Sequence, residues 1–60
     1  MKKFSVSAKR EHGGYAHQTI IANNYSEAEA NYLKENPMNY ILDITLIGIC
    51  DNGHWFNVVL

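Results

Sequence analysis

The side chains that could bind a metal gather at two turns of the sequence. Cys50, Asp51 and His54 flank one turn, and His12 and His17 lie on either side of the other. A structural zinc site needs four convergent ligands, usually as pairs with C-x₂₋₄-C and H-x₃₋₅-H spacing. The only such pair is formed by His12 and His17, and it spans two glycines. The pattern therefore favours solvated histidines, and we expect no metal and no cofactor.

Cys50 and His54 are the one nucleophile and base that the spacing could combine for covalent catalysis. A catalytic thiolate needs a partner base and oxyanion-binding donors within a cleft. A chain of 60 residues offers little room for a cleft, and no glycine-rich phosphate loop precedes a helix. The sequence therefore favours Cys50 as a small buried hydrophobic residue and a protein that is not an enzyme.

Length and charge narrow the class of protein. The chain has 60 residues, five of them Lys or Arg and six Asp or Glu, which gives a net charge of −1. This balance excludes a strongly basic nucleic-acid binder and a strongly acidic DNA mimic, and the length excludes a dinucleotide-binding enzyme. The hydrophobic fraction of 47% is that of a globular chain, so we expect a single domain over residues 1–60.

Cysteine content and hydropathy indicate the cellular compartment of the protein. One cysteine cannot form an intrachain disulfide, whereas small secreted scaffolds hold even sets of cysteines. The N-terminal residues lack the apolar stretch of a signal peptide, and the longest apolar run, at 44–50, is far too short to span a membrane. We therefore expect a cytoplasmic protein.

Hydrophobic periodicity predicts an α+β fold in the order β-β-α-β-β, with a small antiparallel sheet and one helix packed on one face. The strands are expected at 4–8, 15–22, 40–50 and 55–60. Ser26-Glu27-Ala28-Glu29 fits the S-x-x-E capping box that starts a helix, and Asn36-Pro37 would end it. A helix this short must be held by packing on the sheet.

Asn52-Gly53 predicts a two-residue turn that closes the last hairpin. This closure pairs Cys50 with Trp55, Ile49 with Phe56, and Ile47 with Val58.

Alternation along this hairpin assigns its side chains to two faces. One face carries Leu42, Ile44, Leu46, Cys50, Trp55 and Val59; the other carries Ile41, Asp43, Thr45, Ile47, Ile49, Phe56, Val58 and Leu60. One short helix covers only one face, so the other keeps surplus apolar surface unless a bulge near Gly48 exchanges the sides. Two interpretations stay open, scattered exposed hydrophobic residues or an interaction surface. On the second, we expect a homodimer that associates through Ile47, Ile49, Phe56 and Val58.

Candidate partner-binding residues lie at both ends of the chain. The first hairpin combines cations with rings, which suits single-stranded nucleic acid, at Lys9, Arg10, Tyr15 and His17. The tip of the last hairpin offers an exposed aromatic anchor beside polar groups, at Asp51, His54 and Trp55. Lys2 and Lys3 are interpreted as charges that protect a sheet edge from aggregation.

The order of elements and the opening of the helix resemble those of small bacteriophage inhibitor proteins. The resemblance rests on Tyr25-Ser26-Glu27-Ala28-Glu29-Ala30, which opens a short helix after a strand and before two strands joined by a turn. It covers residues 20–60 for compact sheet-plus-helix anti-CRISPR proteins and residues 4–47 for phage proteins that shut down host RNA polymerase. Gly13-Gly14-Tyr15 followed by Ser26-Glu27-Ala28 is also similar to the antitoxin half of HicAB-type pairs, although that family's third strand and proline-rich segment are missing.

The resemblance carries over no functional residue, but it implies a mechanism. It implies a non-catalytic phage or mobile-element inhibitor that binds a host defence complex, namely a CRISPR–Cas effector, and blocks its nucleic-acid binding or assembly. The expected partner is a host protein or ribonucleoprotein, with no membrane involved. The alternatives are a small single-stranded nucleic-acid-binding module, an antitoxin-like or RNA-polymerase-binding protein, and a structural homodimer. The net charge argues against direct nucleic-acid binding but leaves it open.

Overall fold

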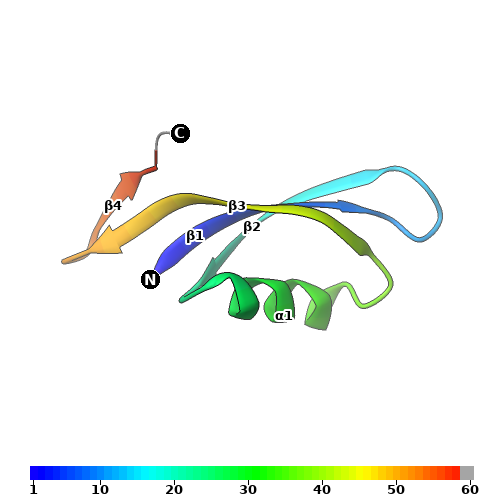
Figure 1. Cartoon of the computed structure of the whole chain (residues 1–60), viewed down its shortest axis with the longest axis horizontal. Coiled ribbons are helices and arrows are strands. Elements are labelled where there is room, and N and C mark those ends of the chain that lie inside the picture. The colour runs from blue at the N-terminus through cyan, green and yellow to red at the C-terminus, as the bar shows by residue number, and fades with distance from the viewer. Residues whose placement is uncertain (59–60) are drawn as a thin grey trace.

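A computed structural model, which describes residues 1–58, contains four strands and one helix in the expected order (Figure 1). The bounds are β1 Lys2–Lys9, β2 Tyr15–Ala22, α1 Tyr25–Glu35, β3 Tyr40–Asp51 and β4 His54–Asn57. The strands form one antiparallel sheet of order β2-β1-β3-β4, and α1 lies against one face of it. The predicted α+β class is confirmed. Val59 and Leu60, the end of the expected last strand, lie outside the described residues.

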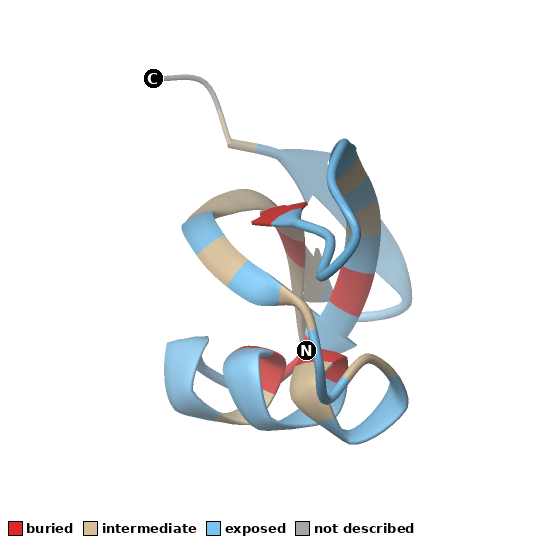
Figure 2. Cartoon of the chain, turned by 90° about the vertical axis from the view of Figure 1, so that its right-hand side faces the viewer, coloured by how far each residue is buried: buried red, intermediate tan, exposed pale blue. Residues whose placement is uncertain are grey.

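The core is built on β1, which lies inside the sheet. Phe4, Val6 and Ala8 are buried because alternate residues of a strand point to one face, here the face covered by α1. The neighbouring strand and the helix complete this layer with Ile20, Ala22, Ala28 and Tyr32. Figure 2 shows buried segments, in red, on the strands and on the side of the helix that faces them. The predicted stripe of Ala28, Tyr32 and Leu33 is the face that α1 packs on the sheet.

The helix begins at Tyr25, earlier than the capping box predicted. Its N-cap is Asn24, in extended conformation, whose side-chain oxygen accepts a hydrogen bond from the Glu27 backbone N–H at 2.8 Å. Asn caps at least as well as Ser, and the Glu27 carboxylate also accepts from Asn23 Nδ2 at 3.3 Å. The expected cap at Ser26 is therefore wrong, and Ser26 is an exposed residue of the first turn.

The position of the cap can be tested by a matched pair of variants. Asn24→Ala should lower the free energy of unfolding by about 1 kcal/mol, because a backbone N–H loses its partner. For a domain of this size that is a fall in Tm of about 4–8 °C. Ser26→Ala removes the same kind of polar group without removing the cap and should leave Tm almost unchanged. Thermal unfolding followed by circular dichroism measures both, and equal falls would contradict the assignment of the cap to Asn24.

Two register shifts between β1 and β3 decide which residues share a face. Phe4 pairs with Leu46 but Lys3 pairs with Gly48, so Ile47 is an extra residue on β3. This confirms the bulge expected near Gly48. The second shift lies between Ser7 and Ala8, whose partners on β3 are Asp43 and Ile41, so Leu42 is the second extra residue.

These bulges correct the faces assigned from simple alternation. Ile41 packs against the core together with Ile44 and Leu46, whereas Leu42 is exposed, because the second bulge reverses the alternation. Asp43 and Thr45 stay on the face away from the helix.

On the C-terminal side of the bulge at Ile47, the residues of β3 change faces once more. Gly48 and Cys50 share the face of Lys3, and Trp55 with them, rather than the face of Ile44. Ile49 and Phe56 are paired on the opposite side and remain exposed.

The closing hairpin has the predicted geometry. Asn52 and Gly53 both have positive φ, at 49° and 79°, as a type I′ turn requires. Cys50 pairs with Trp55 and Ile49 with Phe56, as expected. Val58 N–H donates to the Ile47 carbonyl at 3.0 Å, which continues the same register beyond β4. Self-association through these residues stays a prediction.

Candidate binding face

The side of the sheet opposite α1 is covered by no helix of residues 1–58, and β4 curls toward this side at one end (Figure 1). We call it the open face. It is made of the residues of β1 and β2 that alternate with the core, and of the residues paired with them on β3. These residues are Lys3, Ser5, Ser7, Lys9, Tyr15, His17, Thr19, Ile21, Tyr40, Asp43, Thr45 and Gly48, with Trp55 at one end.

One end of the open face carries a cation between two phenol rings. Lys9 on β1 is paired with Tyr15 on β2 and with Tyr40 on β3. The two tyrosines, each the first residue of its strand, are 67% and 70% exposed. Arg10 follows Lys9 directly and is also exposed. The register therefore gathers one cation and two rings that a ligand can reach, with Arg10 in the adjoining turn.

The middle of the open face is a polar row. Ser7 on β1 pairs with His17 on β2 and Asp43 on β3, and Ser7 Oγ lies 3.0 Å from His17 Nδ1. Thr45 Oγ1 donates to Asp43 Oδ2 at 2.8 Å. A Ser-His-Asp triad needs the histidine between the other two, whereas here the serine is in the middle. The carboxylate cannot orient the imidazole from this position, so the row offers hydrogen bonds rather than an activated nucleophile.

The other end of the open face carries a second cation–ring pair. Lys3 Nζ lies 4.6 Å from the centroid of the Trp55 ring, within the range of a cation–π contact. Gly48 lies beneath the ring: a Cβ there would stand 3.6 Å from Trp55 Cε3 and 3.4 Å from Lys3 Cβ. The prediction that Lys2 and Lys3 protect a sheet edge is wrong, because β1 is an interior strand.

Charged side chains lie on both sides of the sheet, on the open face and on α1. The open face and its adjoining turn carry the cations Lys3, Lys9 and Arg10 and the anions Asp43 and Glu11. The exposed positions of α1 carry two carboxylates and one cation, namely Glu29, Glu35 and Lys34. The open face with its turn therefore has one more cation than carboxylates, and the exposed positions of α1 have one more carboxylate than cations.

The structure separates the predicted partner-binding residues into two groups. Lys9, Arg10, Tyr15 and His17 lie at one end of the sheet, whereas Asp51, His54 and Trp55 lie at the tip of the last hairpin. The strand from Lys3 to Lys9 separates the two ends by about 20 Å. The two groups therefore cannot form one small site, but they can bind one extended ligand.

Sequence reasoning missed five residues of the cation–ring pairs and the polar row. They are Lys3, Ser7, Tyr40, Asp43 and Thr45. The alternation along β1 could have indicated Lys3 and Ser7. The three residues on β3 could not be found in this way, because their position depends on strand order and on the two bulges. Among residues 1–58, no three His, Cys, Asp or Glu side chains converge as metal ligands would. His12 and Glu11 form only an exposed contact at 3.8 Å.

Comparison with known proteins adds no relative: no family model, curated protein or solved structure matches the chain significantly. Of the residues described, none belongs to a helix with the length and apolarity needed to cross a lipid bilayer.

Proposed function

We propose that this chain is a non-catalytic binding module that holds single-stranded nucleic acid on the open face. The observation that carries the proposal is the pairing of exposed rings with cations at both ends of the face, Tyr15 and Tyr40 beside Lys9, and Trp55 beside Lys3. Single strands are bound by stacking of bases on aromatic rings and by cations that neutralise phosphates. The polar row between the two ends supplies hydroxyl, imidazole and carboxylate groups for hydrogen bonds.

The shape of the open face favours single-stranded nucleic acid over duplex DNA, and its few cations predict a weak dependence on salt. A four-stranded sheet face is too broad to enter a groove, whereas unstacked bases can lie on it. Three cations near the face would release few counterions, so we expect a slope of log K against log salt of about −2, from about −0.7 for each phosphate contact on a single strand. Binding should therefore weaken with salt, but less steeply than for a strongly basic protein.

Two lysine variants test where the ligand lies. Lys9→Gln removes a cation from the open face, and Lys34→Gln removes one from the exposed side of α1. With a fluorescent oligothymidylate, Lys9→Gln should weaken binding and reduce the magnitude of the salt slope by about 0.7. Lys34→Gln changes the net charge equally and should leave both nearly unchanged. Equal losses in the two variants would show that binding depends on net charge alone and would contradict the proposal.

The second candidate is a phage or mobile-element inhibitor that docks on a host defence complex such as a CRISPR–Cas effector. It is favoured by exposed apolar surface at the β3–β4 end, where Trp55 is 41% and Phe56 57% exposed. Large exposed aromatic side chains are typical anchors of protein interfaces. The same surface could serve an antitoxin-like protein or one that binds RNA polymerase. Each of these functions would be performed in the host cytoplasm, with the chain acting as a monomer or a homodimer.

Co-purification with a defence complex tests the second candidate. The tagged chain should elute with the effector and reduce immunity in cells, and Trp55→Ala should abolish both effects. Lys9→Gln should leave them intact, because that end of the sheet lies about 20 Å from the hairpin tip. An effector that neither binds the chain nor loses activity in its presence would rule this function out.

A further inference from the structure

Strand β2 is an edge of the sheet that lacks the usual protection against pairing with another strand. It is eight residues long, contains no charged residue and no proline, and pairs with β1 without a register shift. Natural edge strands are commonly short, charged, bulged or covered. The opposite edge follows that rule: β4 has only four residues, and the part of β3 that it leaves unpaired carries the charge of Asp43 and the bulge at Leu42. The long uncharged edge of β2 is therefore available for pairing.

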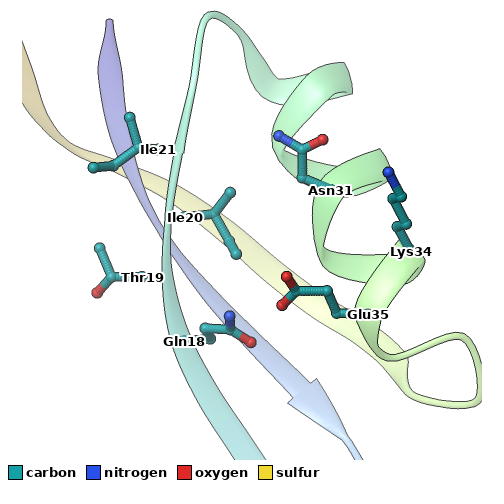
Figure 3. Close-up of a pocket in the computed structure, with 7 residues that line it drawn as sticks. All are labelled: Gln18, Thr19, Ile20, Ile21, Asn31, Lys34 and Glu35. Carbon is teal, nitrogen blue, oxygen red and sulfur yellow. The ribbon is translucent and has the colours of Figure 1, made fainter.

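A groove runs along this edge on the helix side. Its volume is about 470 Å³, and its walls are residues 18–21 of β2 and Asn31, Lys34 and Glu35 of α1. Figure 3 shows these helix side chains across the gap from β2, with Ile20 on the side of the helix. Asn36, the C-cap of α1, donates from Nδ2 to Gln18 Oε1 at 3.5 Å, which links the end of the helix to β2. The groove leaves room for side chains of a strand added to β2.

The hydrogen-bonding pattern of the first hairpin identifies the free backbone groups. Arg10 N–H donates to the Gly14 carbonyl at 3.0 Å, so this pair is hydrogen-bonded. Bonded and non-bonded pairs alternate along an antiparallel ladder. The bonded residues of β2 are then the even-numbered ones. The N–H and C=O groups of Tyr15, His17, Thr19 and Ile21 consequently point away from β1, toward the free edge.

We propose that the β2 edge pairs with the β2 edge of a second copy of this chain, about a two-fold axis at Gln18. In this antiparallel register Tyr15 lies opposite Ile21 of the second copy, and His17 lies opposite its Thr19. An aromatic ring opposite a β-branched side chain is a favourable cross-strand pair, and no like charges meet because β2 has none. All four outward-facing residues find partners, which a self-complementary two-fold interface requires.

The groove fits the same second copy. The two-fold axis places both helices on one side of an eight-stranded sheet, and the partner's Gln18 and Ile20 point to the groove side. Each copy brings one ammonium and one carboxylate to the junction, from Lys34 and Glu35, so the helices approach without net charge. The two open faces then join into one surface. Self-association is thereby assigned to β2 rather than to Ile47, Ile49, Phe56 and Val58.

The test is the mass of the purified full chain in sedimentation equilibrium, with a proline variant. The wild type should approach twice 6.8 kDa as its concentration rises. Thr19→Pro removes an outward N–H but none of the bonds to β1, and proline is tolerated at such an edge position. It should keep the mass of one chain at all concentrations while circular dichroism shows a folded protein. Thr19→Val keeps the N–H and the branched shape and should still dimerise.

A charge-swap variant keeps the test decisive if the proline variant fails to fold. Thr19→Lys should weaken the dimer, because the two introduced ammonium groups are diagonal cross-strand neighbours about the two-fold axis and repel each other. Adding His17→Glu should restore the dimer, because the introduced ammonium then faces a carboxylate across both symmetric contacts. A wild type that keeps the mass of one chain at every concentration would overturn the proposal. A dimer that survives Thr19→Pro but is lost on Phe56→Ser would overturn it as well.

Discussion

Replacing Tyr15 and Tyr40 together by alanine should weaken binding of an oligothymidylate by at least about 30-fold, since each stacked base contributes about 1–3 kcal/mol. Both rings are exposed and flank Lys9 at the same end of the sheet. Their removal takes away the stacking surface without opening a cavity in the core. Fluorescence anisotropy at constant salt measures the loss.

The matched control for this variant keeps the rings and removes only the hydroxyl groups. Tyr15→Phe with Tyr40→Phe should bind within a few-fold of the wild type, because bases stack on the ring and not on the oxygen. Met38→Ala changes an exposed apolar side chain of the α1–β3 loop and should have no effect. If the alanine and phenylalanine pairs bind equally well, the rings do not stack on bases and the proposed site is wrong.

Phe4→Ala should leave the chain largely unfolded at 25 °C. The Phe4 ring is 1% exposed, lies on the interior strand β1, and is 4.8 Å from the Tyr25 ring between centroids. Truncation of a buried phenylalanine lowers the free energy of unfolding by about 3–5 kcal/mol. A domain of 60 residues has a total of about 3–9 kcal/mol at the usual stability per residue. Urea unfolding followed by circular dichroism measures the change.

Ile21→Ala is the comparison variant for Phe4→Ala. Ile21 is on the neighbouring strand but on the open face, where it is exposed, so its truncation creates no cavity. The free energy of unfolding should change by less than about 1 kcal/mol. A Phe4→Ala variant as stable as Ile21→Ala would mean that the core does not lie between β1 and α1.

The local signals of the sequence were sufficient for the elements and for the last hairpin. Asn52-Gly53 imposes positive φ at two consecutive residues, which fixes the register of Cys50 against Trp55 without tertiary help. The helix stripe was also predictable from local sequence, because Ala28 and Tyr32 are one helical turn apart. The cap was missed because Asn24 and Ser26 are both good N-caps, and the choice between them depends on where β2 releases the chain.

The assignment of residues to the two faces of the sheet, and with it the candidate site, depends on long-range strand pairing and was harder to predict from the sequence. Lys3 was interpreted as an edge residue, and only the strand order places β1 inside the sheet. Tyr40 joins Lys9 and Tyr15 only through the register of β3 on β1, and the two bulges move Ile41 into the core and Leu42 out of it. Alternation along one strand cannot reveal an extra residue that exists only relative to its partner strand.

The most direct test of the open face as a nucleic-acid site is a titration of the isotope-labelled full chain with oligothymidylate, followed by backbone amide chemical shifts. We expect the largest shifts at Lys3, Ser7, Lys9, Tyr15 and Tyr40, with the amides of Glu29 and Lys34 on α1 nearly unchanged. The shifts should diminish as salt is raised, because phosphate contacts are screened. Shifts confined to α1, or none at all at low salt, would contradict the proposal that the open face binds single-stranded nucleic acid.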